Sequence, residues 1–106
     1  MSIINSEKVQ LKAKQDWCYQ LPDKVGSDNL RYEVTYHLID ENNIIFVELI
    51  GDGVSKLVRI NLNTTKGVKT GEFISQATFS NIYFQVERIR FYSESDMEFH
   101  LTLFKN

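Results

Sequence analysis

Apolar and polar residues alternate with a period of two along most of this chain, a period that fits extended strands. Between residues 9 and 21 every odd position except Gln15 is apolar, and every even position except Cys18 is polar. Side chains that alternate in this way point to opposite faces of a strand, so one face can be buried. Since no window has the period of an amphipathic helix, the sequence predicts an all-β protein.

The run at residues 9–21 is too long for one straight strand in a small domain. Fully extended, it would span about 43 Å at ~3.3 Å per residue. A compact chain of this length has a radius of gyration of only about 13 Å. We therefore expect a bend or bulge near residues 14–16, with one strand on each side of the corner. Pro22 opens a stretch of turn-forming residues and is expected to end the second strand.

The rest of the chain predicts further short strands separated by turn-forming residues. These strands are expected at residues 30–39, 44–50, 54–62, 72–80, 82–92 and 97–104. The alternation slips at residues 87–88, which predicts a bulge. Sequential hairpins are expected to join 30–39 to 44–50, 44–50 to 54–62, and 82–92 to 97–104.

About seven or eight strands in one chain of 106 residues predict a single antiparallel β-sandwich, jelly-roll-like, over residues 1–106. Its core is expected to consist of the inward-facing residues of the strands. They are Val9, Leu11, Trp17, Tyr19, Tyr32, Val34, Tyr36, Leu38, Val47, Leu49, Val58, Ile60, Phe84, Val86, Phe99, Leu101 and Leu103.

Charge and composition exclude several classes of partner. The net charge is −2, and acidic and basic residues are interleaved with no basic stripe, so nucleic acid is not expected. No apolar run approaches the ~20 residues that a membrane-spanning helix needs. The N-terminus lacks the basic and apolar regions of a secretory signal, and Cys18 is the only cysteine. We expect synthesis in the cytoplasm and no membrane partner.

The residues that could carry chemistry form no recognisable motif. His37 and His100 face outward on their strands, and could bind a metal only if the strands were neighbours and Cys18 or Glu98 supplied a third ligand. Cys18 lies in the middle of a strand, which favours a buried, inert thiol. The acidic residues in the turns do not indicate acid–base chemistry, because Asp stabilises turns and is common there. We expect no metal, no cofactor and no enzymatic activity.

Several apolar residues lie where a partner could reach them. Residues 44–50 are apolar except for Glu48, which predicts either a strand covered on both faces or a face that meets another chain. Other apolar residues at the chain ends either dock a protein partner or cap the sandwich. The candidate partner-binding residues are Ile3, Ile4, Ile44, Phe46, Tyr83 and Phe104.

A second kind of surface is suggested by aromatic residues. Trp17 and Tyr19 share one strand face, and either fill the core or stack on sugar rings. Tyr83 lies between two apolar neighbours and is the better candidate for exposure. The candidate glycan-stacking residues are therefore Trp17, Tyr19 and Tyr83.

The segments FSNIYFQV (residues 79–86) and EFHLTL (residues 98–103) resemble the closing hairpin of small β-sandwich proteins of bacteriophage virions. Those include head-decoration, head-fibre and tail-associated proteins, and carbohydrate-binding modules have similar endings. The resemblance implies a non-enzymatic subunit that attaches to a virion or multimerises on it, and it identifies no functional residues. We expect a structural or interaction protein of a larger assembly, with self or another protein as partner. The alternative is a carbohydrate-binding module.

Overall fold

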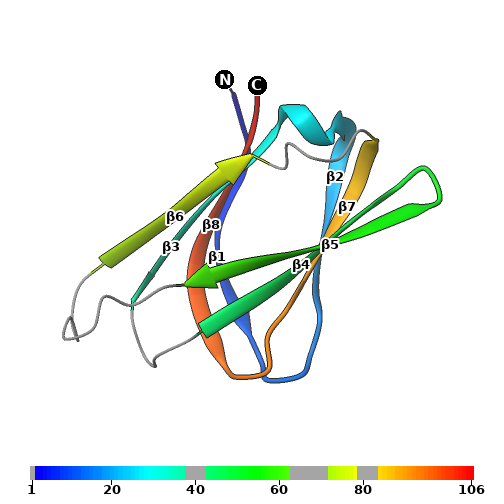
Figure 1. The fold of residues 1–106 in the computed structure, drawn as a ribbon. Coiled ribbons are helices and arrows are strands. Elements are labelled where there is room, and N and C mark those ends of the chain that lie inside the picture. The colour runs from blue at the N-terminus through cyan, green and yellow to red at the C-terminus, as the bar shows by residue number, and fades with distance from the viewer. Residues whose placement is uncertain (1, 38–42, 63–71, 79–83) are drawn as a thin grey trace.

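Two four-stranded antiparallel sheets pack face to face in a sandwich (Figure 1). The computed structural model describes residues 2–37, 43–62, 72–78 and 84–106. Sheet A has the strand order β1-β8-β3-β6 and sheet B the order β2-β7-β4-β5. The elements are β1 (Ser2–Leu11), β2 (Trp17–Gly26), the 3-10 helix η1 (Ser27–Asn29), β3 (Leu30–His37), β4 (Asn43–Gly51), β5 (Val54–Leu62), β6 (Glu72–Thr78), β7 (Gln85–Tyr92) and β8 (Met97–Lys105). The all-β sandwich expected from the alternation is confirmed.

The strands pair in a nested order, the first with the last. β1 pairs with β8, β2 with β7, β3 with β6 and β4 with β5, each antiparallel. A ribbon of paired strands that is folded over in this way is a jelly roll. Because β1 and β8 are neighbours, with Ser2 opposite Lys105, the two ends of the chain lie side by side in Figure 1.

The corner expected in the long alternating run is present. β1 ends at Leu11 in sheet A, and β2 begins at Trp17 in sheet B. Between them Lys14 adopts a positive φ of 63° and its N–H donates to the carbonyl of Ser93 at 2.9 Å. The turn thus ties the β1–β2 link to the β7–β8 link, and carries the alternation from one sheet to the other.

The expectation that Pro22 ends a strand is wrong, because β2 continues to Gly26. The ladder between β2 and β7 is interrupted instead, between Gln20 and Val25. β2 is the edge strand of sheet B, where proline can sit because a missing N–H disturbs little pairing. On β7 the phase slip expected at residues 87–88 is confirmed, since Val86 and Ile89 are both buried.

Of the three expected hairpins, only the one between β4 and β5 is confirmed. Its two-residue turn has positive φ at both Asp52 (51°) and Gly53 (70°), which suits an Asp-Gly pair. The predicted hairpins of β3 with β4 and of β7 with β8 do not form, because each of those links crosses from one sheet to the other. Local spacing cannot distinguish a hairpin from such a crossing.

The core lies between the sheets, and most of its expected members are buried. Trp17, Tyr19, Val58 and Phe84 are only partly buried and pack against the core, and Leu38 lies outside the described residues. The expected core omitted several residues that the structure buries. They are Leu21, Val25, Leu30, Ile45, Ile89, Phe91 and Met97.

Candidate protein-binding face

The outward side of sheet B carries aromatic, aliphatic and charged side chains. On β4, Ile45, Val47 and Leu49 point into the core with 0 % exposure, so their alternate neighbours point away from it. The strand register extends this outward side across all four strands, and we call it the B face. Its members are Asp16, Cys18, Gln20, Ile44, Phe46, Glu48, Ile50, Ser55, Leu57, Arg59, Arg88, Arg90 and Tyr92.

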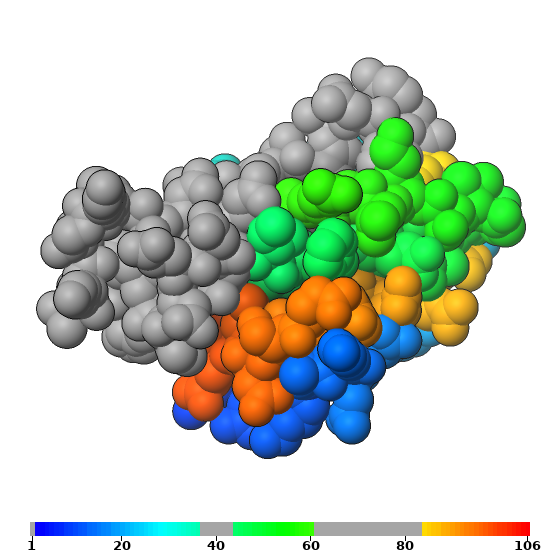
Figure 2. All heavy atoms as spheres, turned by 60° about the horizontal axis from the view of Figure 1, so that its bottom comes forward, coloured from blue at the N-terminus to red at the C-terminus, as the bar shows by residue number. Residues whose placement is uncertain are grey.

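An aromatic and aliphatic cluster runs along the B face. The rings of Phe46 and Tyr92 are paired across β4 and β7, with centroids 6.2 Å apart. From the other side, the guanidinium carbon of Arg59 lies 5.7 Å from the centre of the Phe46 ring. Ile44 is half-buried, and Leu57 on β5 is 54 % exposed. In Figure 2 the atoms of β4 and β5, in green, lie beside orange atoms from the end of β7. The cluster therefore leaves aromatic and aliphatic surface accessible to another molecule.

A charged group lies beside this apolar cluster. Arg90 is held between Glu48, whose Oε1 is 2.9 Å from Nε, and Asp16, whose Oδ1 is 2.7 Å from Nη1. The hydrogen bond to Glu48 is the main reason that the pKa of Arg90 lies above its ordinary value. The guanidinium is thus positioned and neutralised within one chain, which reduces the cost of covering it with a partner.

The six expected partner-binding residues do not form one surface. Ile44 and Phe46 lie together on the B face. Ile3, Ile4 and Phe104 lie at the end of sheet A, where Ile3 is opposite Phe104 in the ladder. Ile3 is 64 % exposed, whereas Ile4 packs against the core. Tyr83 falls outside the described residues.

Trp17 and Tyr19 lie on β2 at the edge of the sandwich. They pack against the core and are also partly exposed to solvent. Both are half-buried, and their rings are nearly parallel, at 9°, with centroids 6.4 Å apart. Trp17 also contacts the buried Phe91 at 5.5 Å between ring centroids. The pair therefore keeps part of two parallel rings accessible while one of them is anchored to the core.

Other members of the B face are not among the residues predicted from the sequence to bind a partner. Tyr92, Leu57, Arg59 and Arg90 come from strands whose neighbours are set only by the sheet order. Their outward phase can be read from the alternation. Which of them lie beside Phe46 depends on register between distant segments, which period-two patterning does not encode.

Polar side chains of β1 and β8 contact one another on the outward side of sheet A. The Oγ of Ser6 lies 2.7 Å from Nε2 of His100 and 3.0 Å from Oγ1 of Thr102. Glu98 pairs with Lys8, with Oε1 and Nζ 2.8 Å apart, and accepts a hydrogen bond from Gln10 at 3.0 Å. These contacts lie on an open strand surface, and they hold neighbouring strands together as cross-strand pairs do.

The condition set for a histidine metal site is met only in part. β3 carries His37 and β8 carries His100, and these strands are neighbours. Cys18 lies on sheet B, so the expectation that it could be the third ligand is wrong, and the expectation of a buried thiol is wrong as well, because Cys18 is exposed. Within the described residues, no three His, Cys, Asp or Glu side chains are grouped in a way that could hold a metal ion.

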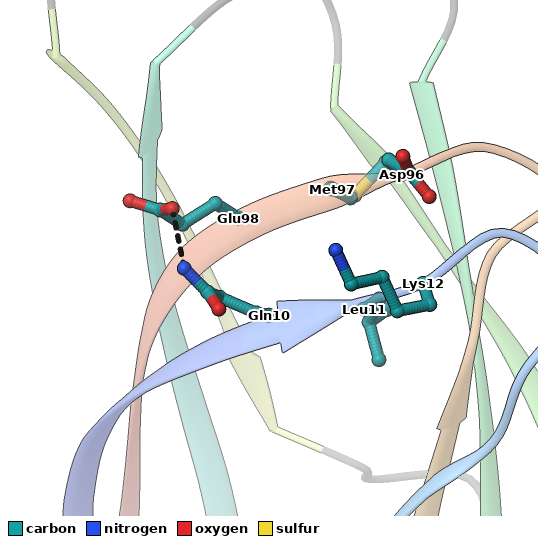
Figure 3. A pocket seen from close by; sticks show the side chains of 6 residues that line it. All are labelled: Gln10, Leu11, Lys12, Asp96, Met97 and Glu98. Carbon is teal, nitrogen blue, oxygen red and sulfur yellow. Dashed lines mark hydrogen bonds between the residues drawn. The ribbon is translucent and has the colours of Figure 1, made fainter.

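A small hollow of about 170 Å³ lies at the end of β1 and β8. Figure 3 shows the hydrogen bond of Gln10 to Glu98 at one side of it and the Lys12 side chain extending over it. Leu11 and Met97 complete its lining, together with Asp96, which also accepts a hydrogen bond from the backbone N–H of Ala13 at 2.8 Å. Asp96 therefore holds the link between β1 and β2 in place through this hydrogen bond.

The sequence matches no known protein-family model, and no curated protein is similar enough to count as a relative. Among the described residues there is no helix of the length and apolarity needed to cross a membrane.

Proposed function

We propose that this protein is a non-enzymatic structural subunit that binds other protein subunits of a larger assembly through its B face. The resemblance of residues 79–86 and 98–103 to bacteriophage virion proteins makes a virion the assembly we favour, as a decoration, head or tail component. In that case the chain is made in the cytoplasm and ends in the particle.

One observation carries the proposal: an aromatic and aliphatic cluster on the side of sheet B that faces away from the core. Strand β4 buries Ile45, Val47 and Leu49, yet its outward positions are again apolar at Ile44, Phe46 and Ile50. A strand of a sheet with one wet side normally alternates apolar with polar residues. Apolar residues on both sides of β4 favour a second, intermolecular partner for the outward side.

The composition of the B face favours protein over nucleic acid. Aromatic residues and arginine are enriched at the centres of protein interfaces, and here Phe46, Tyr92 and Arg59 are in contact. The Arg90 charge is balanced by Glu48 and Asp16, so it offers little to a phosphate backbone.

The test is rate-zonal sedimentation of an extract from the organism or particle preparation that produces the chain, with detection by antibody. We expect the wild-type chain in a fraction far heavier than its own 12.4 kDa. The variant with Phe46→Ser and Leu57→Ser, expressed in the same background, should remain at the top of the gradient. Wild-type chain that sediments only as a free small protein would contradict the proposal.

A matched control separates loss of the B face from loss of the fold. Val54 is 50 % exposed on the same strand as Leu57, but its phase is that of the inward residues Val58 and Ile60. Val54→Ser should therefore co-sediment with the particle like the wild type. If Val54→Ser also leaves the particle, the effect of the double variant does not come from the B face.

A second candidate function is carbohydrate binding at the parallel rings of Trp17 and Tyr19. The 9° angle between them and their partial exposure are the features that favour it, since aromatic faces stack on sugar rings. Titration with a panel of oligosaccharides should then change the fluorescence of Trp17, the only tryptophan of the chain. Unchanged emission across the panel would eliminate this candidate, and Tyr19→Ala should abolish any change that is found.

A further inference from the structure

The charges and apolar groups of the B face are arranged in rows that cross the sheet at right angles to the strands. In the middle row Cys18 of β2 is opposite Arg90 of β7, Arg90 is opposite Glu48 of β4, and Glu48 is opposite Leu57 of β5. The middle row therefore reads apolar, positive, negative, apolar from β2 to β5. The same row read from β5 to β2 has its two charges exchanged.

The row beside it has the same property. It contains Tyr92 opposite Phe46, and Phe46 opposite Arg59. Asp16, the residue before β2, adds an acid at the other end, because it reaches Arg90 on this face at 2.7 Å. From β2 to β5 the row thus reads acid, aromatic, aromatic, base, and in reverse its two ends are exchanged.

A sheet face with rows of this kind is complementary to itself. Consider a two-fold axis that runs parallel to the strands and passes between β7 and β4. Turning a second copy about this axis places its β4 over β7 of the first copy, and its β5 over β2. Arg90 then faces Glu48 of the second copy, and Tyr92 faces Phe46. At the ends of the rows, Asp16 faces Arg59, and Cys18 faces Leu57.

We propose that the B face binds a second copy of this chain about such a two-fold axis. This inference rests on the proposed function, because it names the partner that the B face receives. Closed two-fold dimers bury the same patch on both subunits, which requires a self-complementary surface. Charge complementarity in two rows supplies this requirement, and the aromatic pair supplies an apolar centre.

The third row contributes less. Gln20 of β2 is opposite Arg88 of β7, Arg88 is opposite Ile50 of β4, and Ile50 is opposite Ser55 of β5. Under the same rotation Gln20 faces Ser55, which is a polar pair, and the stem of Arg88 covers Ile50 of the second copy. Long basic side chains can cover apolar surface while the charge stays in water.

Charge reversal at the two central positions provides a direct test. Glu48→Arg gives a face with two positive charges in the middle row, and Arg90→Glu gives a face with two negative charges. Each variant should repel its own copies and sediment as a monomer, while the wild type sediments as a dimer. An equimolar mixture of the two variants should form a heterodimer, because every charge in the middle row then meets an opposite one.

The measurement is sedimentation equilibrium of the purified full chain, with circular dichroism to verify that each variant is folded. A monomeric wild type at all concentrations overturns the inference. It is equally overturned if both reversed variants remain dimers, or if their mixture stays monomeric.

A second pair of variants keeps the test valid if a charge reversal prevents folding. Leu57→Asp changes a residue that is 54 % exposed, so the fold should tolerate it, and it should weaken the dimer by ~tenfold or more in Kd. Val54→Asp, at 50 % exposure on the same strand but in the other phase, should leave Kd unchanged. Equal effects of the two variants would overturn the placement of the interface.

The outcome is separable from that of the proposed function. If the purified wild type is monomeric but still co-sediments with a particle from its source, the second copy is the wrong partner and the B face remains a docking surface. If it is monomeric and also absent from any particle, both proposals fail.

Discussion

Gly51, the last residue of β4, lies directly against the backbone carbonyl of Gln85 at the start of β7. A Cβ added to Gly51 would lie 1.9 Å from the carbonyl oxygen of Gln85 and 3.1 Å from the backbone nitrogen of Glu87. Both are backbone atoms of a paired strand, so neither can rotate away. The close approach explains why the residue before the Asp52-Gly53 turn is also glycine.

Gly51→Ala should therefore destabilise the protein strongly, because β4 and β7 must separate to admit the methyl group. Overpacking of this kind costs roughly 1–3 kcal/mol and can cost more, and we expect the upper end of that range. Urea unfolding followed by circular dichroism measures the loss. Gly26→Ala is the control. A Cβ added to Gly26 would lie 2.9 Å from Oδ1 of Asp28, a side-chain atom that can move away, and the φ of −57° at Gly26 suits alanine. Equal losses in the two variants would show that the close approach does not decide the cost.

Phe91 connects the two sheets and should be among the least replaceable residues. It is 1 % exposed, and its ring contacts Trp17 at 5.5 Å and Phe99 of sheet A at 6.1 Å between centroids. Phe91→Ala should cost about 3–5 kcal/mol, through lost burial and the cavity that remains. Val54→Ala, at an exposed position, should stay within about 0.5 kcal/mol of the wild type. A loss below about 1 kcal/mol for Phe91→Ala would contradict this assignment to the core.

Ser27 fastens the end of β2 to the start of β7. Its backbone N–H donates to the carbonyl of Phe84 at 3.0 Å, and its Oγ accepts from the N–H of Phe84 at 3.4 Å. Because Ser27 is fully buried (0 %), Ser27→Ala leaves a backbone donor without its acceptor, at a cost of about 1–3 kcal/mol. Thermal unfolding should show a lower Tm, while Ser55→Ala on exposed β5 should leave Tm nearly unchanged. An unchanged Tm for Ser27→Ala would mean that another group takes over as acceptor.

Tyr36 should make the fold sensitive to alkaline pH. Burial raises the pKa of its phenol above the ordinary value of 10.0. The unfolded chain then loses this proton at a lower pH than the folded chain. The contribution of Tyr36 to stability is therefore constant below about pH 10 and declines as pH rises from there through the folded pKa.

Comparison of the wild type with Tyr36→Phe tests this linkage. Thermal unfolding of both proteins from about pH 8 to about pH 11 should give a constant difference in Tm up to pH near 10. Above that, the wild type should lose Tm faster than Tyr36→Phe, because the phenylalanine cannot ionise. Parallel curves over the whole range would show that ionisation of Tyr36 is not coupled to unfolding.

The candidate surfaces illustrate how far single-sequence patterns reach. Ile44 and Phe46, which are predicted to bind a partner, lie in the outward phase of β4, whose inward residues are buried. Tyr92, which lies opposite Phe46, and Leu57, which lies opposite Glu48, could not be associated with them from the sequence. Ile3 and Phe104, predicted with the same group, lie on the other sheet. The alternation predicts which face of a strand each side chain lies on, but it does not predict which of the two sheets the strand joins.

By itself, the sequence determined that the chain is built from strands, where it turns a corner near Lys14, and which side chains point inward along most strands. These features depend on residues that are close together in the sequence. Examples are the alternation with a period of two and the glycine after Asp52 in the β4–β5 turn. Only the tertiary structure decided that β1 pairs with β8 and β2 with β7. A strand with one apolar face can bury that face equally well in either sheet. Its sheet and its neighbours are therefore decided by packing and backbone hydrogen bonds between segments far apart in the chain.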